Sequence, residues 1–287
     1  MTARIGLLHT RLRTEERLLL DAAEALGCHI EPIDVRPLVF DPTGMPELRR
    51  FDVILDRCVS LTASRAVVGM LESMGLRCIN TARAIAACSD KLETTLRLLR
   101  DSVPTPDVRI AFDQHSAIDA VEDIGYPAVL KPTVGSWGRL VARANDRDAA
   151  EAIIEHRSVL GSAQHGLHYI QQHIDKPHRD LRVFVVGDRA IAAIERRAEH
   201  WITNTARGGR TAGLSVSDEL ASVSLAAARA VEADVCAIDL LECPHRGLLV
   251  NEVNHSMEFR NSVDVTGVDI PRLVVEHART CVAEVAS

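Results

Sequence analysis

Short apolar runs alternate with stretches of helical period through the first third of the chain. Arg4–His9 is an apolar run of strand length, and Thr14–Gly27 has a helical pattern with Thr14 as its N-cap and Gly27 at its end. This alternation predicts a small parallel sheet covered by helices. The other elements predicted for this unit are strands at Ile30–Asp34, Val53–Asp56 and Cys78–Ile79 and a helix that ends at Met74.

The pattern changes after Pro104 and Pro106, where a second α+β unit is predicted. A third unit opens with the strand Tyr169–Ile174, and its next two strands are expected to form a hairpin about Gly187 and Asp188. We therefore predict an α/β (α+β) fold in three units, residues 1–88, 89–168 and 169–287. The second unit contains predicted strands Val108–Ala111, Ala128–Pro132 and Val141–Asn145 and helices Ser116–Gly125 and Asp146–His156. The third contains predicted strands Asp180–Val186, Ala190–Ile194, Val235–Leu241 and Gly247–Val253, a helix Ser217–Glu232, and a last helix from Pro271.

The composition argues against several classes of partner. Of the 287 residues 47% are hydrophobic and 3% aromatic, so a nucleic-acid surface built on stacked rings is not expected. Lys and Arg number 33 against 40 Asp and Glu, and this net charge of −7 gives no general attraction to nucleic acid. No apolar run has the roughly 18 residues that a membrane helix needs, and the N-terminus lacks the apolar core of a signal peptide. We expect a cytoplasmic protein whose seven cysteines, with no CxxC pair, are reduced thiols.

A candidate metal site lies on the last two predicted strands. Glu252 and Asn254 in NEVN are two residues apart, so their side chains point to the same face of a strand. If the two strands pair, Asp239 in AIDLLE reaches that face as well. Three hard oxygen donors suit Mg²⁺, which fills the rest of its octahedron with water and phosphate. Acidic strand ends that face solvent would give the same pattern, so both interpretations stay open.

Two lysines and a glycine-rich segment are candidates for phosphate binding. Lys91 opens a predicted helix, and Lys131 ends an apolar strand whose burial would draw its ammonium group toward a cleft. GSWGR at 135–139 follows, with two glycines that free backbone N–H groups and the charge of Arg139. No GK[ST] comes after it, so this is not a Walker A loop. A plain hairpin loop and a lid over phosphates both fit the segment.

Charged residues also collect in the third unit. Asp180 and Arg182 fall on the same face of a predicted strand, away from its apolar face. Arg196 and Arg197 follow, and then NTARGG at 204–209, a segment rich in glycine. An arginine cluster of this type suits an anionic substrate or a phosphoryl group in transfer.

In this order the motifs resemble those of the ATP-grasp superfamily, in its RimK-like branch. They are Lys131-Pro132 with the glycine-rich segment, QQHI at 171–174, DLRVFVVG at 180–187, HWITNTARGG at 200–209, AIDLLE at 237–242 and NEVN at 251–254. HWITNTARGG and NEVNHSMEFRNSV are most similar to the LysX family of ligases within that branch. The resemblance covers essentially the whole chain. It implies an N-terminal βαβ domain followed by two α+β subdomains that clasp ATP.

The resemblance also implies ATP and Mg²⁺ as cofactors and a role for each candidate residue. Nucleotide binding is implied for Lys91, Lys131, Gly135, Ser136, Trp137, Gly138, Arg139, Gln171, Gln172, His173, Ile174, Asp180 and Asn204. Asp239, Glu252 and Asn254 would hold Mg²⁺. Catalytic roles near an acyl phosphate are implied for Arg182, Arg196, Asn204 and Arg207, and substrate contacts for Arg196, Asn204, Thr205, Glu258, Phe259, Arg260, Asn261 and Ser262.

The implied activity is the ligation of a carboxylate, activated by ATP as an acyl phosphate, to an amine. In the LysX family the carboxylate is the side chain of the C-terminal glutamate of a small acidic carrier protein, LysW. The amine is the α-amino group of 2-aminoadipate, in lysine biosynthesis. A homo-oligomer, a dimer or tetramer, is expected. Three alternatives stay open: the same ligation with glutamate in arginine biosynthesis, a glutamate ligase that acts on a ribosomal protein, and an ATP-binding regulatory module without activity.

Overall fold

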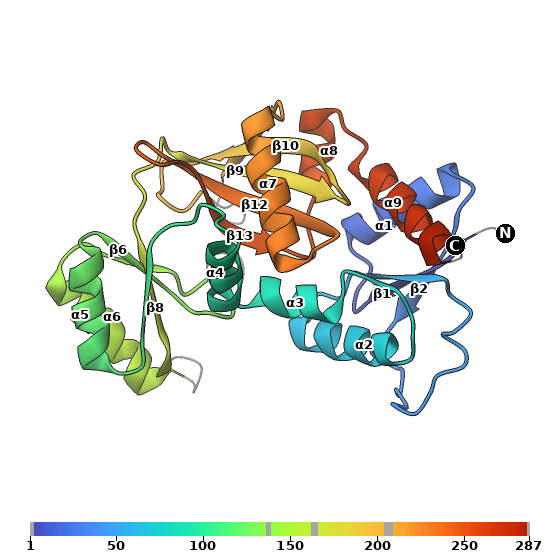
Figure 1. The fold of residues 1–287 in the computed structure, drawn as a ribbon, viewed down its shortest axis with the longest axis horizontal. Helices are drawn as coiled ribbons and strands as arrows, with labels where there is room; N and C mark the ends of the chain where they lie inside the picture. The colour runs from blue at the N-terminus through green and yellow to red at the C-terminus, as the bar shows by residue number, and fades with distance from the viewer. Residues whose placement is uncertain (1–2, 136–138, 162–165, 204–208, 286–287) are drawn as a thin grey trace.

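Three β-sheets organise the chain (Figure 1). The structure is a computed structural model that describes residues 3–135, 139–161, 166–203 and 209–285. The strand orders are β2-β1-β3-β4 in the N-terminal sheet, β5-β8-β6-β7 in the central sheet and β11-β10-β9-β12-β13 in the C-terminal sheet. Helices lie against each sheet, and none of the helices in the described ranges is long and apolar enough to cross a membrane.

The N-terminal sheet is parallel throughout, as the sequence predicts. Helix α1 begins at Thr14, but its N-cap is Arg13 and not Thr14, because Glu16 accepts a hydrogen bond from the backbone N–H of Arg13 at 2.8 Å. Gly27, with φ of +60°, follows the helix in the left-handed region. The elements are β1 Arg4–His9, α1 Thr14–Ala25, β2 His29–Asp34, β3 Val53–Asp56, α2 Leu61–Ser73, β4 Cys78–Ile79, α3 Ala82–Ser89 and α4 Lys91–Arg100.

The central sheet is antiparallel, and α5 and α6 pack side by side against it (Figure 1). Its strand β8 corresponds to the run Tyr169–Ile174, which we assigned to the third unit. That assignment is wrong, because β8 lies between β5 and β6 and hydrogen-bonds to both. The elements are β5 Val108–Ala111, α5 Gln114–Ile124, β6 Ala128–Lys131, β7 Ala142–Ala144, α6 Arg147–Leu160 and β8 His168–Gln172.

The C-terminal sheet contains the predicted hairpin of β9 and β10, which turns at Gly187. Two short elements were not predicted, β11 and α8, and they pack together. At Gly213 of β11 an added Cβ would overlap the carbonyl oxygen of Val265 in α8, so only glycine fits there. The elements are β9 Arg179–Val186, β10 Arg189–Arg197, β11 Arg210–Leu214, α7 Asp218–Val231, β12 Val235–Cys243, β13 Gly247–Asn254, α8 Arg260–Thr266 and α9 Ile270–Val285.

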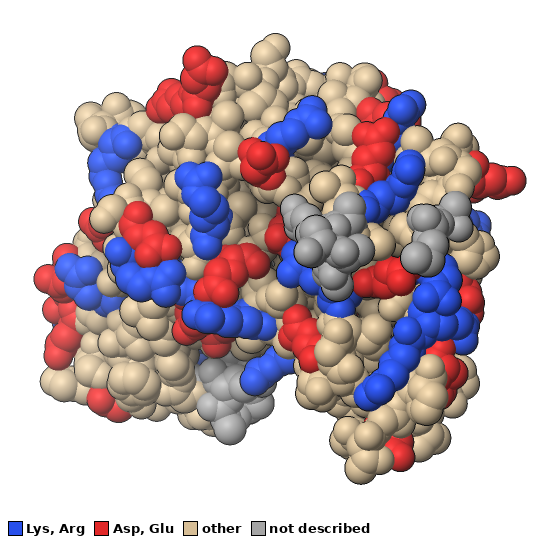
Figure 2. Space-filling model, turned by 45° about the vertical axis from the view of Figure 1, so that its right-hand side comes forward, with Lys and Arg blue, Asp and Glu red and all other residues tan. Residues whose placement is uncertain are grey.

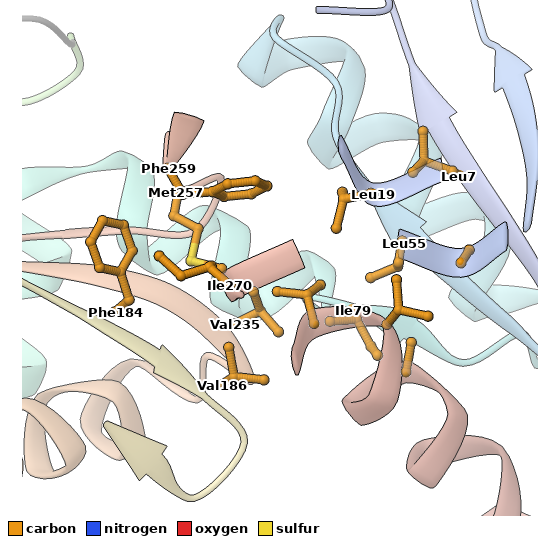
Figure 3. Close-up of a cluster of buried hydrophobic side chains, with 14 of the residues drawn as sticks. Leu7, Leu19, Leu55, Ile79, Phe184, Val186, Val235, Met257, Phe259 and Ile270 are labelled. Atoms are coloured by element: carbon orange, nitrogen blue, oxygen red, sulfur yellow. The ribbon is translucent and has the colours of Figure 1, made fainter. Parts of the chain in front are cut away.

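One hydrophobic core joins the N-terminal and C-terminal sheets (Figure 3). Leu7 and Leu55 of the first sheet face Phe184 and Val235 of the third across this core, and α9 closes it against α1. Asn80 adds a polar connection, because its side-chain Nδ2 donates to Val235 O at 2.7 Å and to His255 O at 2.9 Å. The two sheets are therefore fixed to each other, and the loop after β13 is held between them.

Candidate active site

A first cavity lies between the central and C-terminal sheets, and we call it the intersheet cleft. Its apolar wall includes Ile174, which is 6% exposed and packs with Leu241 and Leu249. His173 and Trp201 line the same cleft with their ring centroids 6.0 Å apart. The cleft is lined by Lys91, Val129, Lys131, Pro132, Gly135, Arg139, Val141, Gln171, Gln172, His173, Ile174, Lys176, Asp180, Trp201, Ile202, Leu241, Asn251 and Glu252.

Lys131, at the end of β6, is buried in this cleft. Its Nζ donates to Gln171 Oε1 at 2.8 Å and to Asn251 Oδ1 at 2.9 Å, and neither acceptor carries a charge. Burial and the nearby charge of Lys91 lower the pKa of Lys131 to about 8. A buried ammonium group held only by neutral amides is arranged to receive an anion.

Lys91 connects the cleft to the acidic residues of the C-terminal sheet. Asp90 caps α4 by accepting from the backbone N–H of Leu92 at 2.8 Å, which fixes Lys91 in the first turn. Lys91 Nζ then donates to Gly135 O at 2.8 Å and lies 3.6 Å from Glu252 Oε1. The beginning of the glycine-rich segment and the expected metal site therefore lie on either side of one cation.

Asp180 also lines the intersheet cleft. It forms an ion pair with Lys176 and lies 3.8 Å from Arg196 Nη2. Lys176 and Asn251 both line the cleft, and our sequence interpretation missed them. Asn251 could have been found, because it opens the NEVN motif that supplies Glu252 and Asn254.

The three expected metal ligands meet where β12 pairs with β13. Asp239 lies opposite Glu252 and Ala237 opposite Asn254 in the strand register. Asp239 is buried and accepts from Arg182 Nε at 2.7 Å and Arg182 Nη2 at 2.8 Å, and Arg196 Nη2 lies 3.2 Å away. Burial alone would raise the pKa of Asp239, but Arg182 and Arg196 lower it to about 2. This carboxylate is therefore charged at neutral pH.

A second cavity is lined by these three expected metal ligands and by neighbouring residues, and we call it the charged chamber. It is lined by Arg13, Cys58, Val59, Leu61, Cys88, Ser89, Val134, Gly135, Arg182, Arg196, Asp239, Glu252, Asn254, His255, Ser256 and Glu258. Gly135 and Glu252 line both cavities, so the chamber continues the intersheet cleft. Arg196 Nε and Asn254 Nδ2 are buried without a hydrogen-bond partner among the described residues. Unpartnered buried donors of this kind fit a bound anion.

The N-terminal unit supplies Arg13 to the wall of the chamber, and ion pairs with buried side chains hold Arg13 there. Glu16 accepts from Arg13 Nη2 at 2.9 Å and from Arg57 Nε at 3.1 Å. Arg57 Nη2 donates to Met257 O at 3.0 Å, which ties these ion pairs to the loop after β13. Burial would raise the pKa of Glu16, but Arg13 and Arg57 lower it. Arg13, Glu16 and Arg57 were absent from the expected site, although Arg13-x-x-Glu16 has the spacing of a capping box.

The expected substrate residues at 258–262 do not all line the charged chamber. Glu258 lines the chamber, whereas Phe259 is 1% exposed inside the hydrophobic core (Figure 3). Its expected side-chain contact with substrate is therefore wrong, because the packing that holds the loop uses that ring. Ser262 is buried in α8, and Arg260 and Asn261 lie exposed at the start of that helix.

Other expected residues divide between the site, the surface and undescribed segments. Ser136, Trp137, Gly138, Asn204, Thr205 and Arg207 lie outside the described residues. Arg196 is buried in the chamber, whereas Arg197 is exposed and paired with Glu195. The arginine cluster expected near residues 196–210 is therefore split in the described part of the chain. The face in Figure 2 shows acidic and basic side chains interspersed over the surface.

The comparisons with known proteins agree with this geometry. The RimK-like ATP-grasp domain matches residues 88–277, and the LysX preATP-grasp domain matches residues 5–87. The chain belongs to the RimK-like ATP-grasp family. This membership confirms the resemblance and the fold class expected from the sequence, and the enzyme class, an ATP-dependent acid–amino-acid ligase.

Two curated relatives and one solved structure illustrate the similarity. The chain is 33% identical to the α-aminoadipate–LysW ligase LysX of Saccharolobus solfataricus, over 93% of this chain and 97% of that protein. It is 32% identical to the glutamate–LysW ligase ArgX of Sulfurisphaera tokodaii, over 96% of this chain and 98% of that protein. The crystal structure of a RimK domain ATP-grasp protein from Sphaerobacter thermophilus superposes with a TM-score of 0.78. It is 27% identical and covers 96% of this chain and 99% of that one.

Proposed function

We propose that this ligase joins the side-chain carboxylate of the C-terminal glutamate of a small acidic LysW-type carrier protein to the α-amino group of 2-aminoadipate. The observation that carries this proposal is the shared wall at Glu252 and Gly135, which line both the intersheet cleft and the charged chamber. A cleft for nucleotide that opens into a chamber for two acidic substrates is the arrangement such a ligation needs. The similarity to LysX supports the choice of carrier and amino acid.

The intersheet cleft fits a nucleotide. Ile174 and Leu241 offer an apolar surface to a purine, and Gln172 Oε1 is a buried acceptor without a partner among the described residues. Lys131 and Lys91 line the same cleft and would contact the phosphates, and Lys91 Nζ lies 3.6 Å from Glu252. ATP would supply the phosphoryl group that turns the carboxylate into an acyl phosphate, with release of ADP.

The three expected metal ligands have the chemistry that Mg²⁺ needs. Asp239, Glu252 and Asn254 supply charged and neutral oxygen donors, and Asp239 is ionised at neutral pH. Bound there, Mg²⁺ would offset charge on the phosphate oxygens. Arg182 and Arg196 hold Asp239 in place. The Nε of Arg196, which has no partner among the described residues, can donate to an anionic oxygen in the chamber.

The residues of the chamber favour positioning over covalent catalysis. Cys58 lines it, but burial and the nearby Asp56 raise the pKa of the Cys58 thiol, so it is protonated at neutral pH. The same holds for Cys88, where burial raises the pKa to about 12. The amine of the amino acid would therefore attack the acyl phosphate directly, with release of inorganic phosphate, and the arginines would orient the two carboxylates around it.

The choice of amino acid rests on the relatives and on chemistry. The identities to LysX and ArgX, 33% and 32%, do not separate 2-aminoadipate from glutamate. The two substrates differ by one methylene, which a pocket discriminates by about 1–3 kcal/mol. The preference for 2-aminoadipate follows from HWITNTARGG and MEFRNSV, which are most similar to the LysX family.

Mass spectrometry of a LysW carrier tests the proposal. The carrier is incubated with enzyme, ATP and Mg²⁺ and with each amino acid in turn. We expect the mass to rise by one 2-aminoadipate less one water. Addition of glutamate and not of 2-aminoadipate would show that the enzyme catalyses the ligation with glutamate, the reaction of arginine biosynthesis. No addition with either amino acid, together with glutamate transfer to a ribosomal protein tail, would refute the carrier function.

A further inference from the structure

Lys131 projects from the face of the central sheet that α5 and α6 do not cover. Leu130 and Ile170 pack in the core under those helices. Lys131 and Gln171, each the next residue on its strand, therefore point to the opposite face, and both line the intersheet cleft. The ammonium group of Lys131 is thus directed across the cleft toward the C-terminal sheet.

Asn251 of β13 receives this ammonium group. Its Oδ1 accepts from Lys131 Nζ at 2.9 Å and from Gln171 Nε2 at 3.3 Å. Lys131 Nζ also donates to Gln171 Oε1 at 2.8 Å, so the three side chains close a ring of hydrogen bonds between two sheets. Glu252 follows Asn251 on the same strand, and the ring therefore fixes Lys131 beside the expected metal site.

The carboxylates that act on Lys131 are each matched by another lysine. Glu252 lies 3.6 Å from Lys91 Nζ, and Asp180 forms an ion pair with Lys176. Lys131 itself forms no ion pair with any residue in the described ranges, because its acceptors are the two amide oxygens. Amide oxygens hold an ammonium group without cancelling its charge, so that charge is left for a ligand.

We propose that Asn251 is a positioning residue for phosphoryl transfer, whose neutral amide holds Lys131 beside Glu252 and leaves the charge of the lysine for the phosphates of the nucleotide. The inference rests on the proposed function and adds a residue that acts through Lys131. An aspartate at this position would have nearly the same shape and would keep both accepted hydrogen bonds. It would also pair with Lys131 and repel the phosphates, so the neutrality of the amide is the property that nucleotide binding requires.

Two isosteric substitutions test this requirement. Asn251→Asp and Gln171→Glu each place a carboxylate on Lys131, and Gln171 is not on the strand that carries Glu252. Calorimetric titration with a nonhydrolysable ATP analogue at pH 7 should show about ten-fold weaker binding for each variant, with a Tm near the wild-type value. The titration is made without Mg²⁺ and then with it, because a disturbed metal site cannot account for a loss without Mg²⁺.

The pH profile gives a second readout that a purely structural role would not change. A carboxylate beside Lys131 keeps its ammonium group protonated to higher pH. The affinity of both variants should therefore be weak but nearly constant between pH 7 and pH 9, whereas the affinity of the wild type should fall over this range. A wild-type pH profile in both folded variants would contradict the proposal.

The matched control adds the same charge elsewhere. Gln114→Glu changes an exposed residue of α5 that lines neither cavity, and its affinity should equal that of the wild type. Wild-type affinity of a folded Asn251→Asp variant, or an equal loss in Gln114→Glu, would overturn the proposal. Gln171→Glu gives the same decision if Asn251→Asp does not fold. Weak binding in both cleft variants, together with no amino-acid transfer to the carrier by the wild type, would support the role of Asn251 and contradict the proposed function alone.

Discussion

The intersheet cleft and the charged chamber share Glu252, yet they are built from different kinds of structure. Several polar groups of the cleft stand on strands that are already hydrogen-bonded in sheets, such as Lys131 on β6 and Asn251 on β13. The chamber takes Arg13 from a loop and Cys88 from α3, residues far apart in the sequence. Its shape therefore depends on the core that joins the N-terminal and C-terminal sheets, whereas one wall of the cleft lies on the central sheet, which contributes no residue to that core.

Residues of the two cavities should therefore respond differently to substitution. Lys131 and Glu252 stand at cavity surfaces, so changes there should alter chemistry and leave folding intact. Asp239 is different, because it also forms ion pairs with Arg182 and with the buried Arg196. We expect function and stability to separate at Glu252 and to fall together at Asp239.

The largest effect is expected from Glu252→Gln. The substitution removes one charged oxygen donor from the proposed Mg²⁺ site, and turnover should fall by about 10³-fold or more. The side chain is 26% exposed and pairs only loosely with Lys91, so Tm should stay near the wild-type value. Steady-state ADP release and a thermal melt measure both quantities. Glu242→Gln, on the neighbouring strand β12, is the matched control and should retain turnover. Near-normal turnover of a folded Glu252→Gln variant would show that Glu252 is not a metal ligand.

Asp239→Asn should lower stability as well as activity. Arg182 and Arg196 would lose their buried carboxylate, and an uncompensated buried charge costs about 3 kcal/mol or more. Because the folded pKa of Asp239 is about 2 and the unfolded value is 3.8, its contribution is complete above pH 4 and is lost as the pH falls through 2. Urea unfolding at pH 7 measures the loss, with Glu252→Gln as the comparison. Equal unfolding free energies of the two variants would contradict the structural role that we assign to the ion pairs of Asp239.

A pH effect of intermediate size is expected in the intersheet cleft. Lys131 has a pKa of about 8 without ligand, and a bound phosphate would raise it. Nucleotide should therefore bind with proton uptake, and affinity should fall about ten-fold between pH 7 and pH 9 as free Lys131 loses its proton. Calorimetry with a nonhydrolysable ATP analogue measures the affinity at each pH. The variant Lys131→Met should bind the analogue weakly, and its affinity should not change with pH. A flat profile for the wild type would show that Lys131 does not contact phosphate.

The smallest effect is expected from the cysteines of the chamber. Cys58 and Cys88 face the proposed substrates, but burial raises the pKa of both thiols, that of Cys88 to about 12. Iodoacetamide at neutral pH should alkylate them slowly and leave turnover unchanged over the minutes of an assay, because only the thiolate reacts. Peptide mapping after alkylation gives the extent at each cysteine. Rapid labelling of Cys88 with parallel loss of turnover would show a reactive thiol in the chamber.

Local patterns in the sequence predict residues of both the cleft and the chamber, whereas contacts that depend on long-range packing are missed. Lys131 follows an apolar run, and Glu252 and Asn254 share a strand face, so local patterns place them. The position of β8 between β5 and β6 depends on long-range pairing, which a local pattern does not encode. Phe259 was misplaced for the same reason, since only the assembled core shows that its ring is buried. Glu16 pairs with Arg13 and also with Arg57, which lies 41 residues further along the chain, beyond the reach of any spacing rule.

Trapping the activated carboxylate with hydroxylamine tests whether the cleft and the chamber form one active site. The enzyme is incubated with ATP, Mg²⁺, the LysW carrier and hydroxylamine, without any amino acid. If the acyl phosphate forms where the two cavities meet, a hydroxamate should appear on the C-terminal glutamate of the carrier, with one ADP for each hydroxamate. ADP formation that ignores the carrier, with no hydroxamate on it, would contradict a shared active site.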